Sequence, residues 1–594
     1  MNSENNTKQL YIACIISALL WQLTYWFTVS YESTFVTICI IEIVGSTYLY
    51  KKNYRLNIKE SRPYILLASV VSFLLTLADY GIFISEDIIG IISGGTAFLS
   101  GIIVFSAIFI CADYLLSRSH RDGNISAEIT DTNGKKGIAV FGFCFPATVD
   151  LLYLFLCCYP GYLNHDSVVQ IMMGVIHEYD NHHPYWHTKL IEWIFLPVYE
   201  ATGNGNLGVA LFCVLQIIAV SLCVMYLAVT LYEMGLGRKW AVGLTLLFGL
   251  MPYNIAFAST ITKDTPFATF MLLLSVALYR RVNDFDNKVR DYILLAIGAA
   301  GGCIFRTNGK IAIIILLIVL LTVYRKHIDK KVSVAVLAGI VFAFMINNLY
   351  LAYINIEQPD VVESLSIPLQ QIARCSYDES ELTADEQEFV AHIGDYRHWG
   401  EIYDPECSDN IKLDIRDNDR VTYIEEHKLE FITNWISIGI HNPYCYFKAW
   451  VDETSGFWSG SYGYSTWDNE MSDVIDMTAY NIYKVSHNIV ACRIWDFWNG
   501  LFVNNRIPPL EMVMAIGLRV FVIMFCAIWA WRNNRKNSIM CVCPLAIELT
   551  LVIATPLNYE FRYAYMIFTT FIIVVIGCLY TGGNQEKLGD ILDE

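Results

Sequence analysis

Five short segments of this 594-residue chain combine charged, histidine and amide side chains that could do chemistry. They are Tyr162–Ser167, Asn181–His187, Thr262–Asp264, Arg306–Asn308 and Glu560–Tyr563. Four of them lie beside the ends of predicted membrane-spanning segments, Asn181–His187 lies within a loop between two such segments, and all five fall on one side of the predicted membrane. Charge close to hydrocarbon is costly, so residues that keep it there are candidates for function. The pattern predicts a reaction centre at a membrane surface.

Asp166, preceded by His165, opens a predicted helix on the outer side. As a general base, its carboxylate would accept the proton of an incoming hydroxyl group. Alternatively, Asp166 caps the helix, a position that Asp fills well. The two roles are compatible, since a cap also fixes the direction of the carboxylate.

Three histidines lie close together at His182, His183 and His187. His183 and His187 are four residues apart, so they share one face of a helix, and this spacing can bind a metal ion. The spacing differs from the HExxH motif of zinc proteases. Hydrogen bonds to a substrate, or packing at the membrane interface, explain the same residues. The sequence therefore leaves all three interpretations in place, and binding of a divalent metal ion as a cofactor is one of them.

Lys263 and Asp264 lie in a tight predicted turn on the outer side. Lys263 could bind a phosphate group, while Asp264 could hold a metal ion or the acceptor. The alternative is that Thr262 or Asp264 caps the following helix.

Arginines lie at the ends of two further predicted spans. Arg306 precedes Asn308, whose Asn-Gly sequence predicts a turn, yet a turn does not require an arginine. Arg562 lies between Glu560 and Tyr563. It could clamp a phosphate group bidentately; alternatively, it pairs with Glu560 or extends to the interface.

The elements that position these residues are predicted membrane spans. Apolar residues make up 55% of the chain, and its mean hydropathy is +0.43, whereas soluble domains contain about 45–50% apolar residues. A helix of about 20 apolar residues crosses a bilayer core of ~30 Å. The sequence predicts an all-α polytopic fold with about fourteen such spans. They are residues 10–28, 34–50, 63–82, 88–116, 137–159, 205–232, 241–259, 265–280, 291–305, 310–324, 332–353, 508–531, 538–555 and 563–581.

Basic residues predict the orientation of the spans. The loops that hold 22 Lys and Arg residues all fall on one side. They are Lys51–Arg62, Arg118–Lys136, Arg238–Lys239, Arg280–Arg290, Arg325–Lys331 and Arg532–Lys536. Both termini are therefore predicted to lie inside, with the reaction centre outside.

Two outer segments, 160–204 and 354–506, are longer than simple turns. The first contains two short predicted helices, which begin near Asp166 and Pro184. The second is a mixed extracytoplasmic domain, here called the acidic domain: residues 357–496 hold 27 Asp and Glu but 9 Lys and Arg. This balance excludes nucleic acid as a partner. Its aromatic stretch Gly456–Trp467 could line a polar ligand.

The chain thus divides into four predicted parts. Residues 1–120 form a block of four helices, and residues 137–353 form the core with its first outer loop. The acidic domain (354–506) and three C-terminal helices with a short tail (507–594) follow. Four cysteines of the acidic domain could form disulfides, but their pairing cannot be read from the sequence: Cys375, Cys407, Cys445 and Cys492.

From about residue 137 to 581, the chain resembles the GT-C superfamily of integral-membrane glycosyltransferases. That superfamily includes protein O-mannosyltransferases and aminoarabinose transferases. More narrowly, the chain resembles an uncharacterised family of bacterial multi-spanning proteins related to them. The segments that carry the resemblance are Pro160–Ser167, Asn181–Pro184, Thr262–Asp264, Phe305–Gly309, Ser366–Arg374, Ser408–Lys412 and Glu560–Tyr563.

The resemblance implies inverting transfer of a sugar from a polyprenyl-phosphate carrier to an extracytoplasmic glycan, lipid or protein, at a bacterial plasma membrane. Asp166 matches the catalytic aspartate of the first outer loop, and Asp264 is the candidate for a second acidic group. Some relatives have an Asp-Glu pair where this chain has Asp166-Ser167, which leaves the acceptor class open. The candidates for substrate binding are His165, His182, His183, His187, Lys263, Arg306, Asn308, Glu560, Arg562 and Tyr563.

Two other functions remain open. A transporter or flippase of lipid-linked saccharides would place polar groups near the midplane or in paired broken helices, whereas the polar groups here lie at one face. A metal-dependent membrane hydrolase would use His182, His183 and His187 as ligands.

Overall fold

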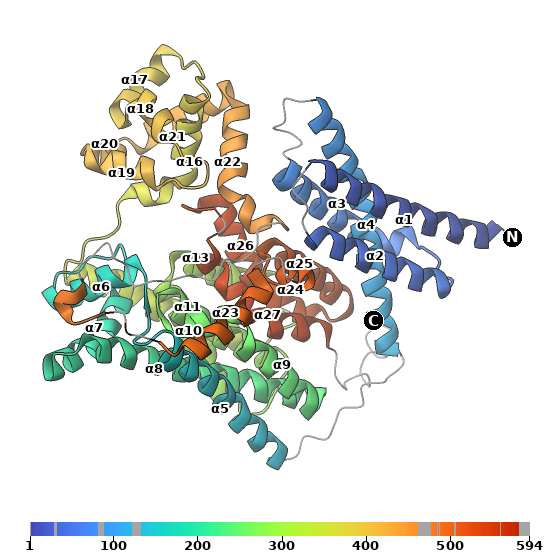
Figure 1. The fold of residues 1–594 in the computed structure, drawn as a ribbon, viewed down its shortest axis with the longest axis horizontal. Helices are drawn as coiled ribbons and strands as arrows, with labels where there is room; N and C mark the ends of the chain where they lie inside the picture. The colour runs from blue at the N-terminus through green and yellow to red at the C-terminus, as the bar shows by residue number, and fades with distance from the viewer. Residues whose placement is uncertain are drawn as a thin grey trace.

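The structure of the protein, a computed structural model, describes residues 2–28, 33–80, 88–121, 132–460, 477–483, 485, 487–503, 507–558 and 560–580. Among these residues, every regular element except two short strands is a helix, which confirms the all-α fold class. The helices form a broad bundle, and a separate group of helices stands at one end of it (Figure 1).

Eight helical segments in the described part of the chain are long and apolar enough to cross a membrane. A ninth results if α9 (Arg238–Leu250) and α10 (Pro252–Ala258), bent by 62° to each other, count as one span. Each of the fourteen segments predicted as spans falls mainly on helices, although the helix is interrupted inside two of them, 241–259 and 508–531. The eight segments are Ile58–Ala78, Ile88–Ser119, Thr132–Cys157, Gly205–Leu236, Lys330–Tyr353, Ile516–Asn533, Arg535–Ala554 and Phe561–Leu579. These are the helices of a membrane protein.

The first four helices pack against one another beside the rest of the bundle (Figure 1). They are α1 (Asn2–Thr28), α2 (Ser33–Lys51), α3 (Ile58–Tyr80) and α4 (Ile88–Arg121). Trp21 is buried among them, with its ring edge-on to Phe35 at 5.3 Å and to Phe105 at 5.5 Å. Such aromatic pairs stabilise the packing beyond the area that they bury.

The core helices follow in the order α5 (Thr132–Cys157), α6 (His165–Ile176), α7 (Tyr185–Thr202), α8 (Gly205–Leu231), α9, α10, α11 (Asp264–Val282), α12 (Lys288–Phe305), α13 (Thr307–Thr322), α14 (Lys330–Phe344) and α15 (Leu351–Tyr353). Two π-helical turns, Tyr232–Leu236 and Met345–Tyr350, extend α8 and α14. Gly298 allows α11 and α12 to approach closely, since the Cβ of any other residue at this position would lie 2.7 Å from the backbone nitrogen of Leu274. A buried ion pair, Arg280 Nε to Asp291 Oδ2 at 2.8 Å, joins the same two helices.

Two strands of two residues each pair in parallel, β1 (Tyr162–Leu163) and β2 (Thr260–Ile261). β1 leads into α6, and β2 leads into α11. The pair therefore sets the beginnings of these two helices side by side, although about a hundred residues separate them in the chain.

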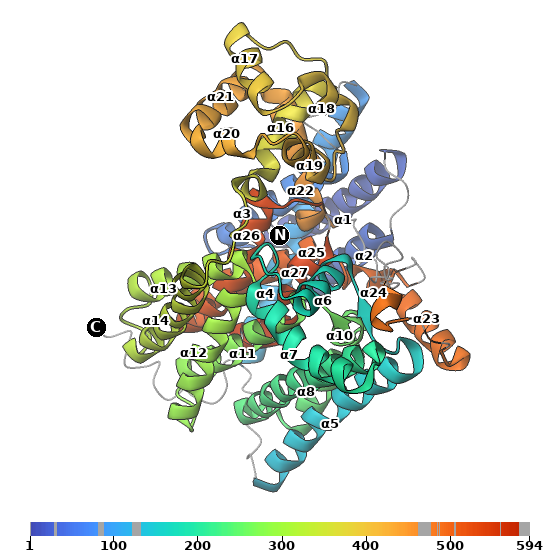
Figure 2. The ribbon, with the colours of Figure 1, turned by 90° about the vertical axis from the view of Figure 1, so that its left-hand side faces the viewer.

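Among the described residues of the acidic domain, every regular element is a helix, joined by loops and isolated bridges such as Asp404 to Cys407, so its regular structure is helical and not mixed. Its elements pack around a core of their own, in which Trp399 is fully buried. α22 (Pro443–Trp458) then returns to the bundle, and Figures 1 and 2 show the helices between Ser366 and His441 grouped at one end of the molecule. The elements are a 3-10 turn at Val361–Leu365, α16 (Ser366–Tyr377), α17 (Ala384–Ile393), α18 (Tyr396–Ile402), α19 (Asp409–Asp417), α20 (Val421–Glu426), α21 (Lys428–His441) and α22 (Pro443–Trp458). The predicted aromatic loop Gly456–Trp467 begins at the end of α22, and residues 461–476 lie outside the described residues.

The last described residues of the segment predicted as the acidic domain, a 3-10 turn at Met477–Tyr480 and α23 (Ile489–Val503), pack against the core, where α23 contacts α5. The C-terminal part consists of α24 (Pro508–Met512), α25 (Ile516–Asn533), a 3-10 segment at Arg535–Cys541, α26 (Val542–Ala554) and α27 (Phe561–Leu579). The predicted span 508–531 is broken, because α24 ends at Met512 and α25 begins at Ile516. α27 packs against both α11 and α25.

All seventeen cysteines are free thiols, so no disulfide is formed in the structure. Of the four cysteines in the acidic domain, Cys375 and Cys445 lie side by side in its core. The hydrogen bond from the Cys375 thiol lowers the pKa of Cys445 to about 7.

Candidate active site

Asp166 lies in the first turn of α6, which begins at His165. The helix is capped by Asn164: its side-chain oxygen accepts the backbone N–H of Ser167 at 2.8 Å, and the Ser167 hydroxyl accepts the backbone N–H of Asn164 at 2.8 Å. The prediction that Asp166 is the cap is therefore wrong. Its carboxylate is free to take other partners, and the helix N-terminus favours its charged form.

The strand pair brings Lys263 to Asp166. Tyr162 pairs with Thr260, and the two strands run on side by side, β1 into α6 and β2 into the turn that contains Lys263. Nζ of Lys263 lies 3.1 Å from Oδ2 of Asp166.

Gln216 of α8 holds β2 in position. Its side-chain amide donates to the carbonyl oxygens of Ala258 at 3.1 Å and Thr260 at 2.8 Å. Sequence reasoning missed this residue, although an amide inside the apolar run 207–229 was a usable signal. A buried amide is costly unless it is hydrogen-bonded, so it indicates a partner.

Asp264 is fully buried at the first position of α11. Lys263 precedes it at the cap position and makes no side-chain capping bond, so the predicted cap by Thr262 or Asp264 is wrong. Instead, the Thr262 hydroxyl donates to the Asp264 carboxylate at 2.9 Å. The other oxygen of Asp264 forms an ion pair with Arg306.

Arg306 occupies the break between α12 and α13. The turn predicted after it is wrong: Asn308 lies in the first turn of α13, where its side-chain oxygen accepts the backbone N–H of Gly309 at 3.1 Å. Nη2 of Arg306 pairs with Asp264, while its Nε is buried and has no hydrogen-bond acceptor among the described residues. The helix break thus aims a guanidinium group at Asp264 with a donor to spare.

Arg562, in the first turn of α27, contacts two carboxylates. Its Nη1 lies 3.3 Å from Oδ2 of Asp166, and its Nε lies 3.3 Å from Oε1 of Glu560. The ring of Tyr563 lies 5.2 Å from the guanidinium carbon of Arg562 and 4.6 Å from that of Arg306. Tyr563 therefore brings two guanidinium groups together over one aromatic ring.

Six of the predicted residues form one group, here called the charge cluster, with three carboxylates and three cations. Burial raises the pKa of Asp166, but the charges of Lys263 and Arg562 outweigh it and hold that pKa well below its usual range. Burial raises the pKa of Glu560, and Arg562 opposes this shift. The members of the charge cluster are Asp166, Lys263, Asp264, Arg306, Glu560 and Arg562.

The four predicted histidines have different surroundings. Nδ1 of His183 lies 3.4 Å from Nζ of Lys263, and burial lowers its pKa to about 3. His187 is buried with Nδ1 2.9 Å from the Gln170 side-chain oxygen. His182 lies 3.8 Å from a carboxylate oxygen of Glu363, and His165 is exposed. Of the four, the structure brings His183 to the charge cluster.

The described parts of the chain contain no group of three or more His, Cys, Asp or Glu side chains that could hold a metal ion. His182, His183 and His187 accordingly do not converge on a common point; each has a separate partner, as described above.

The acidic domain holds the segment that leads to α27. The backbone N–H and the hydroxyl of Ser408 both donate to the carbonyl oxygen of Pro556 at 3.0 Å. The backbone N–H of Asn558 donates to the carbonyl oxygen of Glu406 at 2.8 Å. Glu560 follows two residues later. The acidic domain therefore contributes to the position of Glu560.

Residues 178–587 match a family described as a family of unknown function, DUF6020. No curated protein and no solved structure matches the chain. The matched region begins after Asp166 and includes the other five residues of the charge cluster. Because the match covers more than half of the chain, the protein belongs to the DUF6020 family.

Proposed function

We propose that this protein is an inverting membrane glycosyltransferase that moves a sugar from a polyprenyl-phosphate carrier to an extracytoplasmic acceptor hydroxyl. The observation that carries the proposal is the position of Asp166, with Lys263 at 3.1 Å and Arg562 at 3.3 Å, beside a bundle of apolar helices. Transfer from a lipid phosphate needs a base for the acceptor proton and fixed cations for the leaving phosphate. The charge cluster offers both.

In the proposed reaction, the acceptor oxygen bonds to the anomeric carbon while the bond from that carbon to the phosphate oxygen breaks. Attack on the face opposite the phosphate inverts the configuration. Asp166 takes the acceptor proton. The electron pair leaves on polyprenyl phosphate, and Lys263, Arg306 and Arg562 stabilise its added negative charge.

Donor binding would also activate the base. In the free protein, the low pKa of Asp166 makes it a weak base. The donor phosphate competes with Asp166 for Lys263 and Arg562, and each contact that it takes raises the basicity of the carboxylate. Asp166 would therefore gain its full basicity once the donor is bound.

Asp264 has a supporting role in this proposal. It is fully buried against Arg306, so it orients the guanidinium group rather than meeting the acceptor. The buried Nε of Arg306, which has no acceptor among the described residues, fits a phosphate oxygen through a charge-assisted hydrogen bond. His183 is held neutral by burial and could hydrogen-bond a sugar hydroxyl.

The proposal includes a topology. It has about fourteen spans, both termini inside a bacterial plasma membrane, and the acidic domain and charge cluster outside. The isoprenoid chain would lie among the apolar helices, and the acceptor, a cell-envelope glycan, lipid or protein, would approach from the side of the acidic domain.

The test is a transfer assay with the purified full chain in lipid nanodiscs. A panel of polyprenyl-phosphate sugars is offered with a mixture of hydroxyl acceptors, and mass spectrometry follows free polyprenyl phosphate and the glycosylated product. We expect both to appear together for at least one donor. Movement of an intact lipid-linked saccharide across a vesicle membrane, without bond cleavage, would identify a flippase instead.

A further inference from the structure

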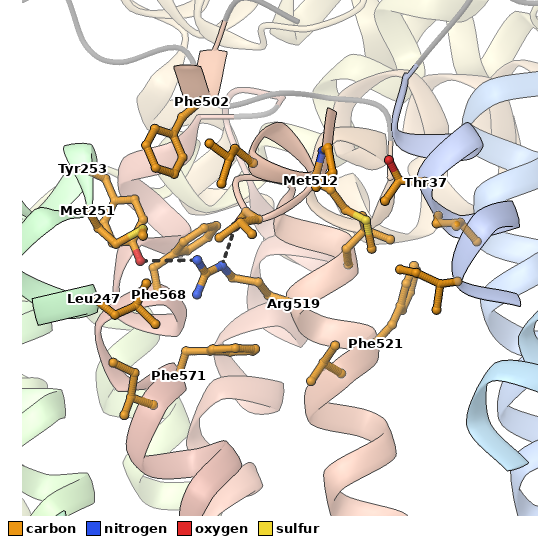
Figure 3. A pocket seen from close by; sticks show the side chains of 18 of the residues that line it. Thr37, Leu247, Met251, Tyr253, Phe502, Met512, Arg519, Phe521, Phe568 and Phe571 are labelled. Atoms are coloured by element: carbon orange, nitrogen blue, oxygen red, sulfur yellow. Dashed lines mark hydrogen bonds between the residues drawn. The ribbon is translucent and has the colours of Figure 1, made fainter. Parts of the chain in front are cut away.

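A cavity of about 540 Å³ lies between the first four helices and the rest of the bundle (Figure 3). This volume falls within the range of about 300–1,000 Å³ that ligand sites have. Its walls are almost entirely apolar and come from α2, α4, α9, α10, α23, α24, α25 and α27, together with residues between these helices. Three of these helices, α4, α25 and α27, are candidate membrane spans. The cavity is therefore at a depth where hydrocarbon chains are the natural occupants.

The cavity is distinct from the charge cluster. Phe571 of α27 lines it, and Arg562 lies nine residues earlier on the same helix. Nine residues are about 2.5 turns, which places the two side chains on opposite faces of α27. No residue of the charge cluster lines the cavity.

Arg519 of α25 is the cation of this cavity, and Figure 3 shows its side chain reaching into it. The side chain is buried, with its guanidinium carbon 4.1 Å from the ring centre of Phe568. Nε donates to the carbonyl oxygen of Val513 at 2.8 Å, and Nη2 donates to the hydroxyl of Tyr253 at 3.3 Å. An arginine has five N–H donors, and the described residues place no carboxylate beside Arg519. An unpaired intramembrane charge indicates a functional site.

The cavity is also reachable from the side. Three of its lining residues, Ile41, Leu247 and Val522, keep 40–48% of their surface exposed. In a membrane, such exposed apolar side chains meet lipid, so a lipid chain can enter between the helices without crossing water.

We propose that this cavity binds an anionic membrane lipid, with the headgroup phosphate on Arg519 and a hydrocarbon chain along the aromatic and aliphatic walls. The phosphate supplies the negative charge that the buried guanidinium group lacks, through charge-assisted hydrogen bonds. The apolar walls explain why the ligand is a lipid and not a free anion. This site does not depend on the proposed glycosyltransferase activity, because it lies on the other face of α27.

The experiment measures lipid affinity by native mass spectrometry of the full chain in neutral detergent. The probes are phosphatidylglycerol, diacylglycerol without a phosphate, and inorganic phosphate alone. Arg519→Gln removes the charge, and Arg532→Gln is the matched control, since Arg532 lies at the other end of α25 and contacts the carbonyl oxygen of Glu60. Val522→Trp fills the cavity and leaves Arg519 in place.

We expect Arg519→Gln to lower the affinity for phosphatidylglycerol about tenfold, which corresponds to one charge-assisted contact, and to leave the affinity for diacylglycerol unchanged. Val522→Trp should lower the affinity for both lipids, and Arg532→Gln should lower neither. Unchanged phosphatidylglycerol affinity in Arg519→Gln would overturn the proposal. An equal loss of affinity for both lipids would also overturn it, because it would mean that Arg519 supports the structure of the cavity and does not bind the phosphate. Inorganic phosphate that binds as tightly as the lipid would also overturn it. If Arg519→Gln does not fold, the Val522→Trp result decides, and retained lipid binding there contradicts the site.

Discussion

Replacement of Asp166 by Asn should move two measured quantities in opposite directions. Asn keeps the size of the side chain and an oxygen that accepts hydrogen bonds, but it has no basicity. Turnover should fall, because no group remains to take the acceptor proton. Carrier binding should become tighter. In the unchanged protein, Lys263 and Arg562 lie 3.1 and 3.3 Å from the Asp166 carboxylate, and the carrier phosphate must compete with that negative charge; in the variant it does not.

The sizes of both effects follow from these contacts. General-base catalysis contributes about 10²–10⁴-fold, so turnover should fall by that factor. A hydrogen bond to a charged group is worth about 1.5–3 kcal/mol. If the phosphate gains the lower value from the released cations, its affinity rises about tenfold.

The assay compares turnover at saturating donor with the dissociation constant of polyprenyl phosphate, both in nanodiscs. Asn164→Ala is the matched control, because Asn164 caps α6 two residues before Asp166. Loss of such a cap costs about 1 kcal/mol of stability. The control should therefore lower the melting temperature while the folded protein keeps its turnover.

Two results would refute this reasoning. Turnover in Asp166→Asn close to that of the unchanged protein would remove Asp166 as the base. Carrier affinity that falls together with turnover would mean that the carboxylate holds Lys263 and Arg562 in place and does not compete for them.

Three further predictions use the same structure. Arg562→Lys should lower the affinity for polyprenyl phosphate about tenfold, because the point charge of a lysine cannot form the bidentate contact, whereas Glu560→Gln should leave this affinity unchanged. Equal losses of affinity in a binding assay would instead favour internal pairing of Arg562 with Glu560. His187 has a pKa of about 3 in the folded protein and ~6.5 in the unfolded chain. The unfolded chain therefore binds a proton at a higher pH than the folded protein does. The free energy of unfolding should fall as the pH drops below ~6.5, by up to about 1.4 kcal/mol per pH unit. Thermal melts of His187→Asn should show a shallower fall, and an unchanged slope would contradict the assignment. Gln216→Leu should cost about 1–3 kcal/mol in chemical unfolding, because it leaves buried carbonyl groups without donors; a neutral result would mean that β2 does not need this side chain.

The positions of the helices could be predicted from the sequence because burial in a membrane demands long apolar runs. Every predicted span falls mainly on helices. The break between Met512 and Ile516 was missed, since its sequence is as apolar as the helices beside it. Hydropathy reports which side chains avoid water and carries little information on where the backbone turns.

The members of the charge cluster could also be predicted, because a charged residue at the end of an apolar run is conspicuous. Their pairing could not. Asp166 meets Lys263 through the β1–β2 pair and meets Arg562 across almost four hundred residues of chain. Such contacts depend on the three-dimensional packing, and a two-residue strand has no periodicity for a sequence pattern to detect. The alternative that Asp166 caps α6 was wrong for a related reason: adjacent polar residues all suit a helix start, and only the backbone decides that Asn164 is the cap.

α27 connects three parts of the molecule. The acidic domain holds the segment before it through Ser408 and Asn558. Its first turn carries Arg562 toward Asp166, and its opposite face, with Phe571, lines the cavity of Arg519. The acidic domain, the charge cluster and the cavity therefore share one helix. The distance between Arg562 and Asp166, the contact that the proposed donor phosphate must break, depends on how the acidic domain and the cavity walls hold α27 in place.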